Sequence, residues 1–322
     1  MIRKIFEPVN PSAQQGVRNV MKYLAAISGK KVVTGQHTQT LLQEELSLIR
    51  DVTGKEPALL GFELLSYSPN INYSDTDDEC MKEVHENYGM LSRAWDWAEK
   101  KGLVTFTWHW FSPLGGRSKS FFTANTDFDA AKAAAKGSNE YRALISDLDV
   151  MAGYLRPFCD KGVPVLWRPF HEGEGDWFWW AAKGPEPLKA LWRIMFERFT
   201  KVHHLDNLIW VWNATLPECY PGDDVVDVIS RDMYPEAHCH LSCKDYYEDM
   251  MKITDTPKIA LIGEIGTLPD VDKMISEGVG FASFMTWSKG FVLSEDFTSF
   301  EFLRQTYDSE NSVTLENLPE LY

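Results

Sequence analysis

The chain has 322 residues, and 44% of them are hydrophobic, which is enough for a large core and excludes a disordered or fibrous protein. Its 47 acidic and 32 basic residues give a formal net charge of −15. An acidic surface repels phosphates and anionic lipids, so we expect neither a nucleic-acid nor a membrane partner. We expect residues 1–322 to form a single domain.

The first residues carry Arg3 and Lys4 but no apolar stretch behind them, so they do not form a signal peptide. The five cysteines are odd in number and irregularly spaced, which argues against a disulfide framework. These features predict a cytoplasmic protein, or a secreted one if a leader has been removed. The sequence gives no indication of oligomeric state.

A helical pattern over residues 12–28 precedes eight apolar runs with strand character. Most of the runs are continuously apolar, as expected of parallel strands buried on both faces. The predicted strands cover residues 31–37, 57–65, 103–110, 163–170, 208–214, 226–234, 259–266 and 281–288. Helical patterns lie between or after them, at residues 38–53, 87–101, 138–161, 186–204, 245–254 and 299–309.

Alternating strands and helices predict an α/β fold, and eight units favour a single (β/α)₈ TIM barrel with an additional N-terminal helix. The helix between the fifth and sixth strands is the weakest, because Pro217, Pro221 and Gly222 interrupt it. An open doubly wound sheet is the alternative. That fold usually binds a nucleotide through a glycine-rich loop, and no such motif follows the first strand.

Two glutamates stand out at strand ends, where the active sites of such barrels lie. Glu172 follows the fourth strand in WRPFHEGEGDWFWW, and Glu264 lies in the seventh strand in IALIGEIGT. A carboxylate buried without a partner is costly, so each must be hydrogen-bonded or functional. The fourth and seventh strands face each other across a barrel. The pair can therefore flank one glycosidic bond, as in a glycosidase.

The surroundings of the two glutamates suggest their roles. The aromatic residues 177–180 would raise the pKa of Glu172 and keep it protonated as an acid. Arg168 lies four residues before it and would neutralise Glu264 as an ionised nucleophile. A lone strand-end glutamate is more often a helix cap or an ion-pair partner, but the opposed pair favours catalysis.

The segment RPFHEGEGDWFWW resembles the acid/base motif of glycoside hydrolase family 26, and GEIG resembles its nucleophile motif. Related retaining barrels usually have Asn before the acid, whereas this chain has His171, the family 26 pattern. The resemblance implies retaining cleavage of β-1,4-mannosidic bonds in mannan, glucomannan, galactomannan or their oligosaccharides, without cofactor or metal. Lichenase or xylanase activity, as in other members, is the alternative.

The resemblance implies that Glu172 is the acid/base and Glu264 the nucleophile. It also implies sugar contacts from His109 and His171, a pocket wall from Trp177, a hydrogen bond from Tyr234 to Glu264 and a stacking floor at Trp287. The family often has Arg after that last tryptophan, where this chain has Ser288. The insertion at residues 66–86 is another place where substrate preference can differ.

Histidines at strand ends leave a metal site as an alternative, through His37, His109 and His171. Metallohydrolase barrels usually open with two histidines on the first strand, and only His37 is present, so we expect no catalytic metal. The loop containing His238, Cys239, His240 and Cys243 could bind zinc, but a second pair at finger-like spacing is missing.

Glu174 and Asp176 are alternative acids within the same motif as Glu172, but they lie beyond the strand end. A non-catalytic carbohydrate-binding protein is the alternative from another class. Such a protein could keep an aromatic cleft and lose one carboxylate, whereas this chain keeps both.

Overall fold

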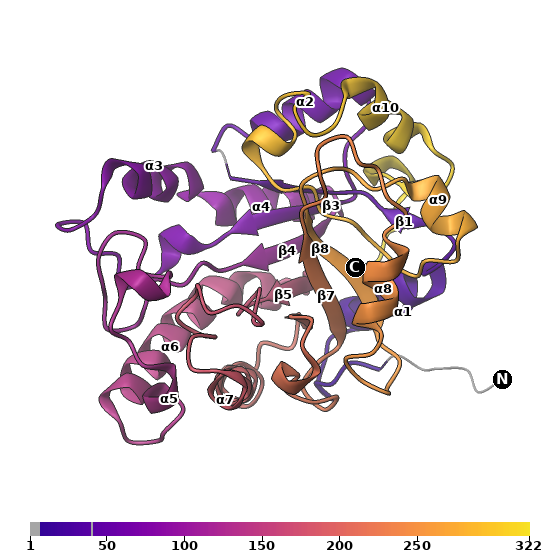
Figure 1. Ribbon diagram of the computed structural model, residues 1–322. Coiled ribbons are helices and arrows are strands. Elements are labelled where there is room, and N and C mark those ends of the chain that lie inside the picture. Colours follow the sequence, from indigo (N-terminus) through magenta and orange to yellow (C-terminus); the bar gives the residue numbers. More distant parts are fainter. Residues whose placement is uncertain (1–6, 40) are drawn as a thin grey trace.

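The computed structural model describes residues 7–39 and 41–322. Its centre is a curled sheet of seven parallel strands in the order β2-β3-β4-β5-β6-β7-β8, with helices around it (Figure 1). The strands are Gly35–Thr38 (β2), Leu59–Glu63 (β3), Leu103–Thr107 (β4), Val165–Arg168 (β5), Leu208–Asn213 (β6), Val228–Met233 (β7) and Ile259–Ile265 (β8). Each overlaps one of the first seven predicted strands, so the predicted α/β class is confirmed.

The predicted eighth strand, residues 281–288, is not a regular strand. Its backbone forms hydrogen bonds with both edge strands of the sheet, β2 and β8. Ile265 N donates to Met285 O (2.8 Å), and His37 N donates to Thr286 O (2.8 Å). Because the bonds alternate between two neighbours, the segment forms isolated bridges rather than a continuous ladder. It nevertheless joins the first strand of the sheet to the last.

The first predicted strand is divided at Thr34. Before it, Val32–Val33 (β1) pairs with Ser312–Val313 (β9) in a separate parallel sheet of two strands. The sequence pattern did not indicate β9. After Thr34, β2 begins the main sheet. The Thr34 hydroxyl donates to Val313 O (2.9 Å), which satisfies a buried polar group at the division.

Helix α1, Gln15–Ile27, buries one apolar face containing Val17, Val20 and Leu24. This face belongs to a buried cluster with Leu59 and Leu103, the first residues of β3 and β4. α1 therefore packs against the amino ends of the strands. In Figure 1 it lies on the right, and α3 lies on the left.

Six outer helices overlap predicted ones: Glu44–Thr53 (α2), Met90–Glu99 (α4), Asn139–Asp160 (α6), Pro185–Glu197 (α7), Lys244–Met250 (α8) and Phe300–Asp308 (α10). α2 begins later than predicted, after Gln43, whose positive φ of 52° is not helical. α7 passes into a π-helical turn, Arg198–Val202. Three further helices were not predicted: Asp78–Asn87 (α3) in the insertion, Ala130–Ala133 (α5) and Val271–Ser276 (α9).

Short 3₁₀ turns complete the secondary structure, at Leu65–Tyr67, Thr123–Asn125, Pro217–Cys219, Lys289–Phe291 and Leu315–Asn317. The segment between β6 and β7 contains only the turn at Pro217–Cys219, because its prolines cannot continue a helix. None of the helices in the described ranges is long and apolar enough to cross a membrane.

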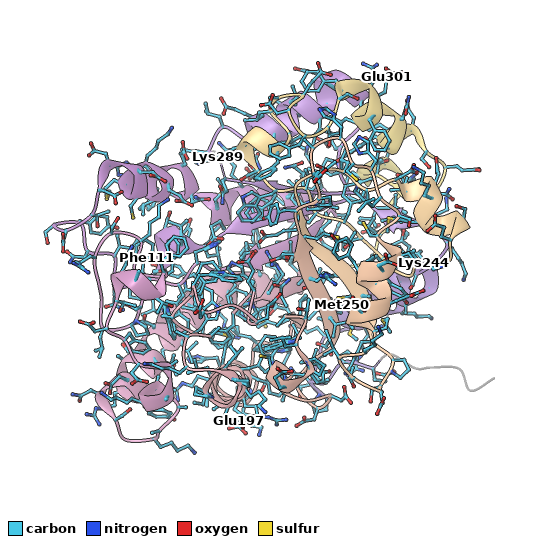
Figure 2. All side chains as sticks on the ribbon, viewed as in Figure 1. Phe111, Glu197, Lys244, Met250, Lys289 and Glu301 are labelled. Carbon is cyan, nitrogen blue, oxygen red and sulfur yellow. The ribbon has the colours of Figure 1, made fainter. Side chains whose placement is uncertain are left out.

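Side chains fill the inside of the curled sheet and the space between sheet and helices (Figure 2). All five cysteines are free, as their spacing predicted. Much of the aromatic content belongs to the core, since nine of the twelve tryptophans are almost fully buried. These are Trp97, Trp108, Trp110, Trp167, Trp179, Trp180, Trp192, Trp210 and Trp212.

Gly35 allows the segment 281–288, which joins the two ends of the sheet, to approach β2. A Cβ atom at this position would lie 2.3 Å from the backbone oxygen of Phe284. We expect Gly35→Ala to destabilise the protein by about 1–3 kcal/mol in urea denaturation, because the backbone must move. Gly153→Ala is the control, since a Cβ there meets nothing within 4 Å and α6 gains helix propensity. Equal stabilities of the two variants would contradict this packing.

Candidate active site

Polar side chains gather at the carboxyl ends of the strands. Glu63, Arg168 and Asn213 are the last residues of β3, β5 and β6, and Asp232 and Glu264 are the penultimate residues of β7 and β8. The side chains of Arg168, Asp232 and Glu264 are each only 4% exposed. Charged groups this deeply buried require partners, and each of these has one.

A β-bulge turns Glu264 into the site. Arg231 pairs with Ile262, but the next residue of β7, Asp232, pairs with Glu264, so Gly263 is the extra residue. In a regular strand Glu264 would share the outward face of Ile262, and the bulge reverses this. A Cβ on Gly263 would lie 2.5 Å from Asp232 Oδ1. This explains why glycine precedes the glutamate in the GEIG motif.

Arg168 connects two carboxylates. Its Nη1 donates to both oxygens of Asp232 (3.1 and 2.9 Å), and its Nη2 donates to Glu264 Oε1. Nη2 also donates to Thr107 Oγ1 (2.9 Å). Burial alone would lower the pKa of Arg168, but the charges of Asp232 and Glu264 raise it, so the guanidinium stays protonated. The predicted contact between Arg168 and Glu264 is confirmed.

Glu264 also accepts a hydrogen bond from Tyr234. The tyrosine hydroxyl lies 2.5 Å from Glu264 Oε2, as the family resemblance implied. The pKa of Glu264 is raised overall, because burial and the nearby charge of Asp232 raise it by more than Arg168 and the Tyr234 hydroxyl lower it. Each carboxyl oxygen of Glu264 has a donor.

The backbone conformation at Glu172 sets the direction of its side chain. Its φ is +53°, and that of Phe170 is +52°, a left-handed conformation that non-glycine residues adopt rarely and at a cost. Asn213 supports the turn: its Oδ1 accepts from Glu172 N (2.7 Å), and its main-chain oxygen accepts from Gly173 N (3.1 Å). The turn thus directs Glu172 towards Asp232 and Glu264.

The carboxylates lie close together. One oxygen each from Glu172, Asp232 and Glu264 lies within 4.8 Å of the other two. Retaining glycosidases hold their two catalytic carboxyl groups roughly 5–5.5 Å apart, and inverting ones ~6.5–9.5 Å. The spacing between Glu172 and Glu264 therefore suits attack on a sugar without an intervening water.

Burial raises the pKa of Glu172, and the charge of Asp232 raises it further. The aromatic run contributes less directly than predicted. Only Trp177 bonds the carboxyl group, through Nε1 to Oε2 (2.7 Å), and this bond lowers the pKa. Phe178, Trp179 and Trp180 are buried in the core instead.

Two histidines extend the site from Glu63. The buried Glu63 accepts from His109 N (2.7 Å) and bonds His109 Nδ1 (2.7 Å). Burial opposes a charge on His109, but Glu63 raises its pKa, whereas burial and the charge of His109 lower the pKa of His171. The two Nε2 atoms lie 3.1 Å apart, so protonated His109 can donate to neutral His171. The sequence places Glu63 at a strand end but did not indicate its contact with His109.

The half-buried Trp287 lies between two histidine rings. Its ring centroid is 4.2 Å from that of His37 and 6.3 Å from that of His109. Gln36 fixes the backbone here, since its Nε2 donates to Trp287 O (3.1 Å) and to Thr286 O (3.2 Å). The predicted floor residue therefore belongs to the same site as the two glutamates.

The histidines and the loop considered as alternative metal sites do not form a cluster of three ligands. Among the described residues, the histidine, cysteine and acidic groups close enough to hold a metal are Glu172, Asp232 and Glu264. In that loop, His240 bonds Leu268 O (2.7 Å) and stacks on Phe302.

Of the alternative acids, Glu174 lies near Thr215 (3.3 Å), and Asp176 is exposed. Neither belongs to the three-carboxylate cluster. Glu63, Asn213 and Asp232 are among the polar residues that the sequence places at strand ends, but the sequence assigned no role to them. Their position at strand ends was the signal that pointed to them.

Glu264 has a hydrogen-bond donor at each carboxyl oxygen, and Glu172 is a second carboxyl group close to it. Such a pair can carry out acid-assisted displacement at a sugar carbon. The family model described as glycosyl hydrolase family 26 matches residues 9–311. The chain belongs to this family.

Relatives with known names agree with this assignment. The chain is 35% identical over 317 residues to a mannan endo-1,4-beta-mannosidase of Thermothelomyces thermophilus, covering 96% of this chain and 62% of that protein. It is 27% identical to mannan endo-1,4-beta-mannosidase A of Piromyces sp, covering 97% of this chain and 50% of that protein. The chain thus spans only half to three-fifths of these relatives.

Solved structures have the same fold. A GH26-CBM35 β-(1,4)-mannanase of Podospora anserina superposes with a TM-score of 0.87 at 34% identity, covering 98% of this chain and 69% of that chain. A β-mannanase from a symbiotic protist of the termite Reticulitermes speratus, complexed with gluco-manno-oligosaccharide, has a TM-score of 0.87 at 31% identity and covers 98% of both chains.

We predict that Arg168→Met destabilises the protein by roughly 3–5 kcal/mol at pH 7, because Asp232 and Glu264 lose their cation. Without it, burial and the charge of Asp232 raise the pKa of Glu264 unopposed by a cation, so it lies still further above its unfolded value. The variant should therefore regain stability as the pH falls towards about 4. Urea denaturation at several pH values measures this.

The matched control is Arg198→Met. Arg198 also bonds a carboxylate through two nitrogens, that of Asp149, but both side chains are partly exposed. Its loss should cost only about 0–1 kcal/mol. A small effect at Arg168, or one that does not change with pH, would contradict the account of the buried network.

Proposed function

We propose that the chain is a retaining glycoside hydrolase that cleaves β-1,4-mannosidic bonds in mannan, glucomannan, galactomannan or derived oligosaccharides. The main support is the pair Glu172 and Glu264 at the carboxyl ends of β5 and β8. One carboxyl oxygen of each lies within 4.8 Å of the other. Membership of family 26 and the names of the relatives support the substrate class.

In the first step, Glu264 attacks the anomeric carbon while Glu172 protonates the departing glycosidic oxygen. Glu264 Oε1 is bonded by Arg168, and Oε2 by Tyr234. As the covalent bond forms, the carboxylate loses charge, and the guanidinium remains paired with Asp232. The product of this step is a glycosyl ester on Glu264 and a free sugar leaving group.

In the second step, Glu172, now ionised, removes a proton from water, which attacks the same carbon and releases Glu264. Two displacements at one carbon retain its configuration. The raised pKa of Glu172 suits both roles, because the group must be protonated at rest and able to accept a proton later.

We further propose that four residues bind the sugar at the cleaved bond. His109 and His171 lie beside Glu172 and would bond sugar hydroxyl groups, with His171 near the 2-position. Trp177 would form the wall next to the acid, and Trp287 the floor on which the sugar ring stacks. The hydrogen bonds from Glu63 to His109 support a fixed orientation of that ring.

Mannan is the proposed substrate, and mixed-linkage β-glucan and xylan are the alternatives. The protist enzyme was crystallised with gluco-manno-oligosaccharide, which supports a site that accepts mannose and glucose units. Incubation of the protein with mannan, lichenan and xylan, followed by product sizing, distinguishes the three. Greater activity on lichenan or xylan would overturn the proposed specificity.

We also propose that the seven-stranded sheet and the joining segment 281–286 together form a (β/α)₈ barrel, with α1 as an additional helix below it. The hydrogen bonds that the segment makes to β2 and β8 support this. So does the apolar cluster that α1 shares with the amino ends of the strands.

We predict that Glu264→Gln and Glu172→Gln each reduce kcat/KM on manno-oligosaccharides, by about 10²–10⁴-fold for the acid and by at least as much for the nucleophile. Glu174→Gln is the control, because it removes a neighbouring carboxylate outside the cluster and should stay within a few fold. Proton NMR of early hydrolysis should show the β-anomer of the product first. An α-anomer would exclude the double displacement.

The pH dependence provides an independent test. The charge of Asp232 raises the pKa of both Glu172 and Glu264. Activity needs Glu264 ionised and Glu172 protonated. Asp232→Asn should therefore move both limbs of the pH profile of kcat/KM to lower pH. Asp249→Asn, on the outer helix α8, should leave the profile in place. A shift to higher pH would contradict the assignment.

A further inference from the structure

The loop after β4 is bonded to the loop after β5, which carries the candidate acid. Thr123 N donates to Trp177 O (2.7 Å), and Thr123 Oγ1 donates to Asp176 O (2.7 Å). Beside these bonds, Phe122 and Phe178 form an antiparallel bridge. Phe122 and Thr123 of one loop thus contact three consecutive residues, 176–178, of the other. These residues belong to loops far apart in sequence, so the contact is tertiary.

Trp177 is the residue that this contact fixes. The residue is 45% exposed, so burial alone does not hold it. Its ring lies over Gly175, where an added Cβ would be about 2.3 Å from the ring carbons. The backbone at Asp176 and Trp177, bonded by Thr123, and the space left by Gly175 therefore set the position of the indole.

The indole in turn controls Glu172. Trp177 Nε1 donates to Glu172 Oε2 (2.7 Å), so this oxygen acts as an acceptor. In a protonated carboxyl group the acceptor and the hydroxyl are different oxygens. The bond from Trp177 therefore leaves the proton on Oε1. If the indole moves, the carboxyl group loses this preference and its orientation.

We propose that Thr123 is a positioning residue for acid catalysis, which acts through Trp177 to keep the proton of Glu172 on Oε1, directed at the leaving group. This inference rests on the proposed function and deepens it. If Thr123 has this role, the loop after β4 contributes to the part of the site where the leaving group is protonated. Thr123 itself touches neither the sugar nor the carboxyl group.

The test compares two substrates that share a mannobiosyl unit. An unactivated manno-oligosaccharide needs a proton from Glu172, whereas a 2,4-dinitrophenyl β-mannobioside has a leaving group that departs without one. Thr123→Val removes the hydroxyl bond and keeps the side-chain volume. We expect kcat/KM to fall about three- to tenfold on the oligosaccharide and to stay within twofold on the aryl glycoside. Thr123→Ser should restore the oligosaccharide activity.

The pH profile adds a second readout. The bond from Trp177 lowers the pKa of Glu172, so loosening it should move the alkaline limb on the oligosaccharide to higher pH. Thr126→Val is the matched control. Its hydroxyl bonds Ser112 and Gly115 in the same loop, so any effect should be equal on both substrates.

Equal losses on the two substrates in Thr123→Val would show a merely structural role and overturn the inference. So would unchanged activity on both. The proposed function fails in a different way, because the unmodified protein would then cleave neither mannoside. A wild-type enzyme that cleaves both substrates, together with a Thr123→Val variant that behaves identically, would therefore refute the role of Thr123 alone.

Discussion

One buried guanidinium supports the whole site. Arg168 stands between Asp232 and Glu264, and all three side chains are almost completely inaccessible to water. Arg168 lowers the pKa of Glu264 against the effects of burial and of Asp232, and only an ionised Glu264 can act as a nucleophile. The cation therefore favours the charged form of the nucleophile. The other features of the site bring groups to this charge or adjust its effect.

The backbone brings the carboxylates to Arg168 in two different ways. On β8, the bulge at Gly263 turns Glu264 inward and opposite Asp232. After β5, a left-handed turn supported by Asn213 places Glu172 beside them. Asp232 then has two effects: it anchors Arg168, and its charge raises the pKa of both glutamates. The same residue thus favours the protonated form of Glu172, while its partner Arg168 opposes the rise in the pKa of Glu264.

The sequence predicted those parts that depend on local patterns. Seven strands appear as apolar runs, because parallel strands are buried on both faces. Glu172 and Glu264 were found because they end such runs in unusual contexts. The helix in the insertion was missed, although Asp77 caps it by accepting from Cys80 N (2.8 Å). The cap is a local signal, but the short polar helix that follows has only a weak apolar face.

Other features depend on contacts that no local pattern shows. The segment 281–288 resembles a strand in composition, yet it divides its hydrogen bonds between β2 and β8. The bulge appears in the sequence only as a glycine before a glutamate. The contact from Thr123 to Trp177 joins residues 54 positions apart, and threonine in a loop carries no signal of its own. Such features follow from closure of the sheet and could be recognised only in three dimensions.

The central claim is that Glu264 forms a covalent bond to the sugar. A 2-deoxy-2-fluoro-mannobiosyl fluoride reacts with a retaining enzyme but leaves it slowly, so the glycosyl-enzyme accumulates. Mass spectrometry of the digested protein should find the label on the peptide containing Glu264, on that residue. A label on Glu172, or inactivation of substrate turnover without any covalent label, would contradict the account.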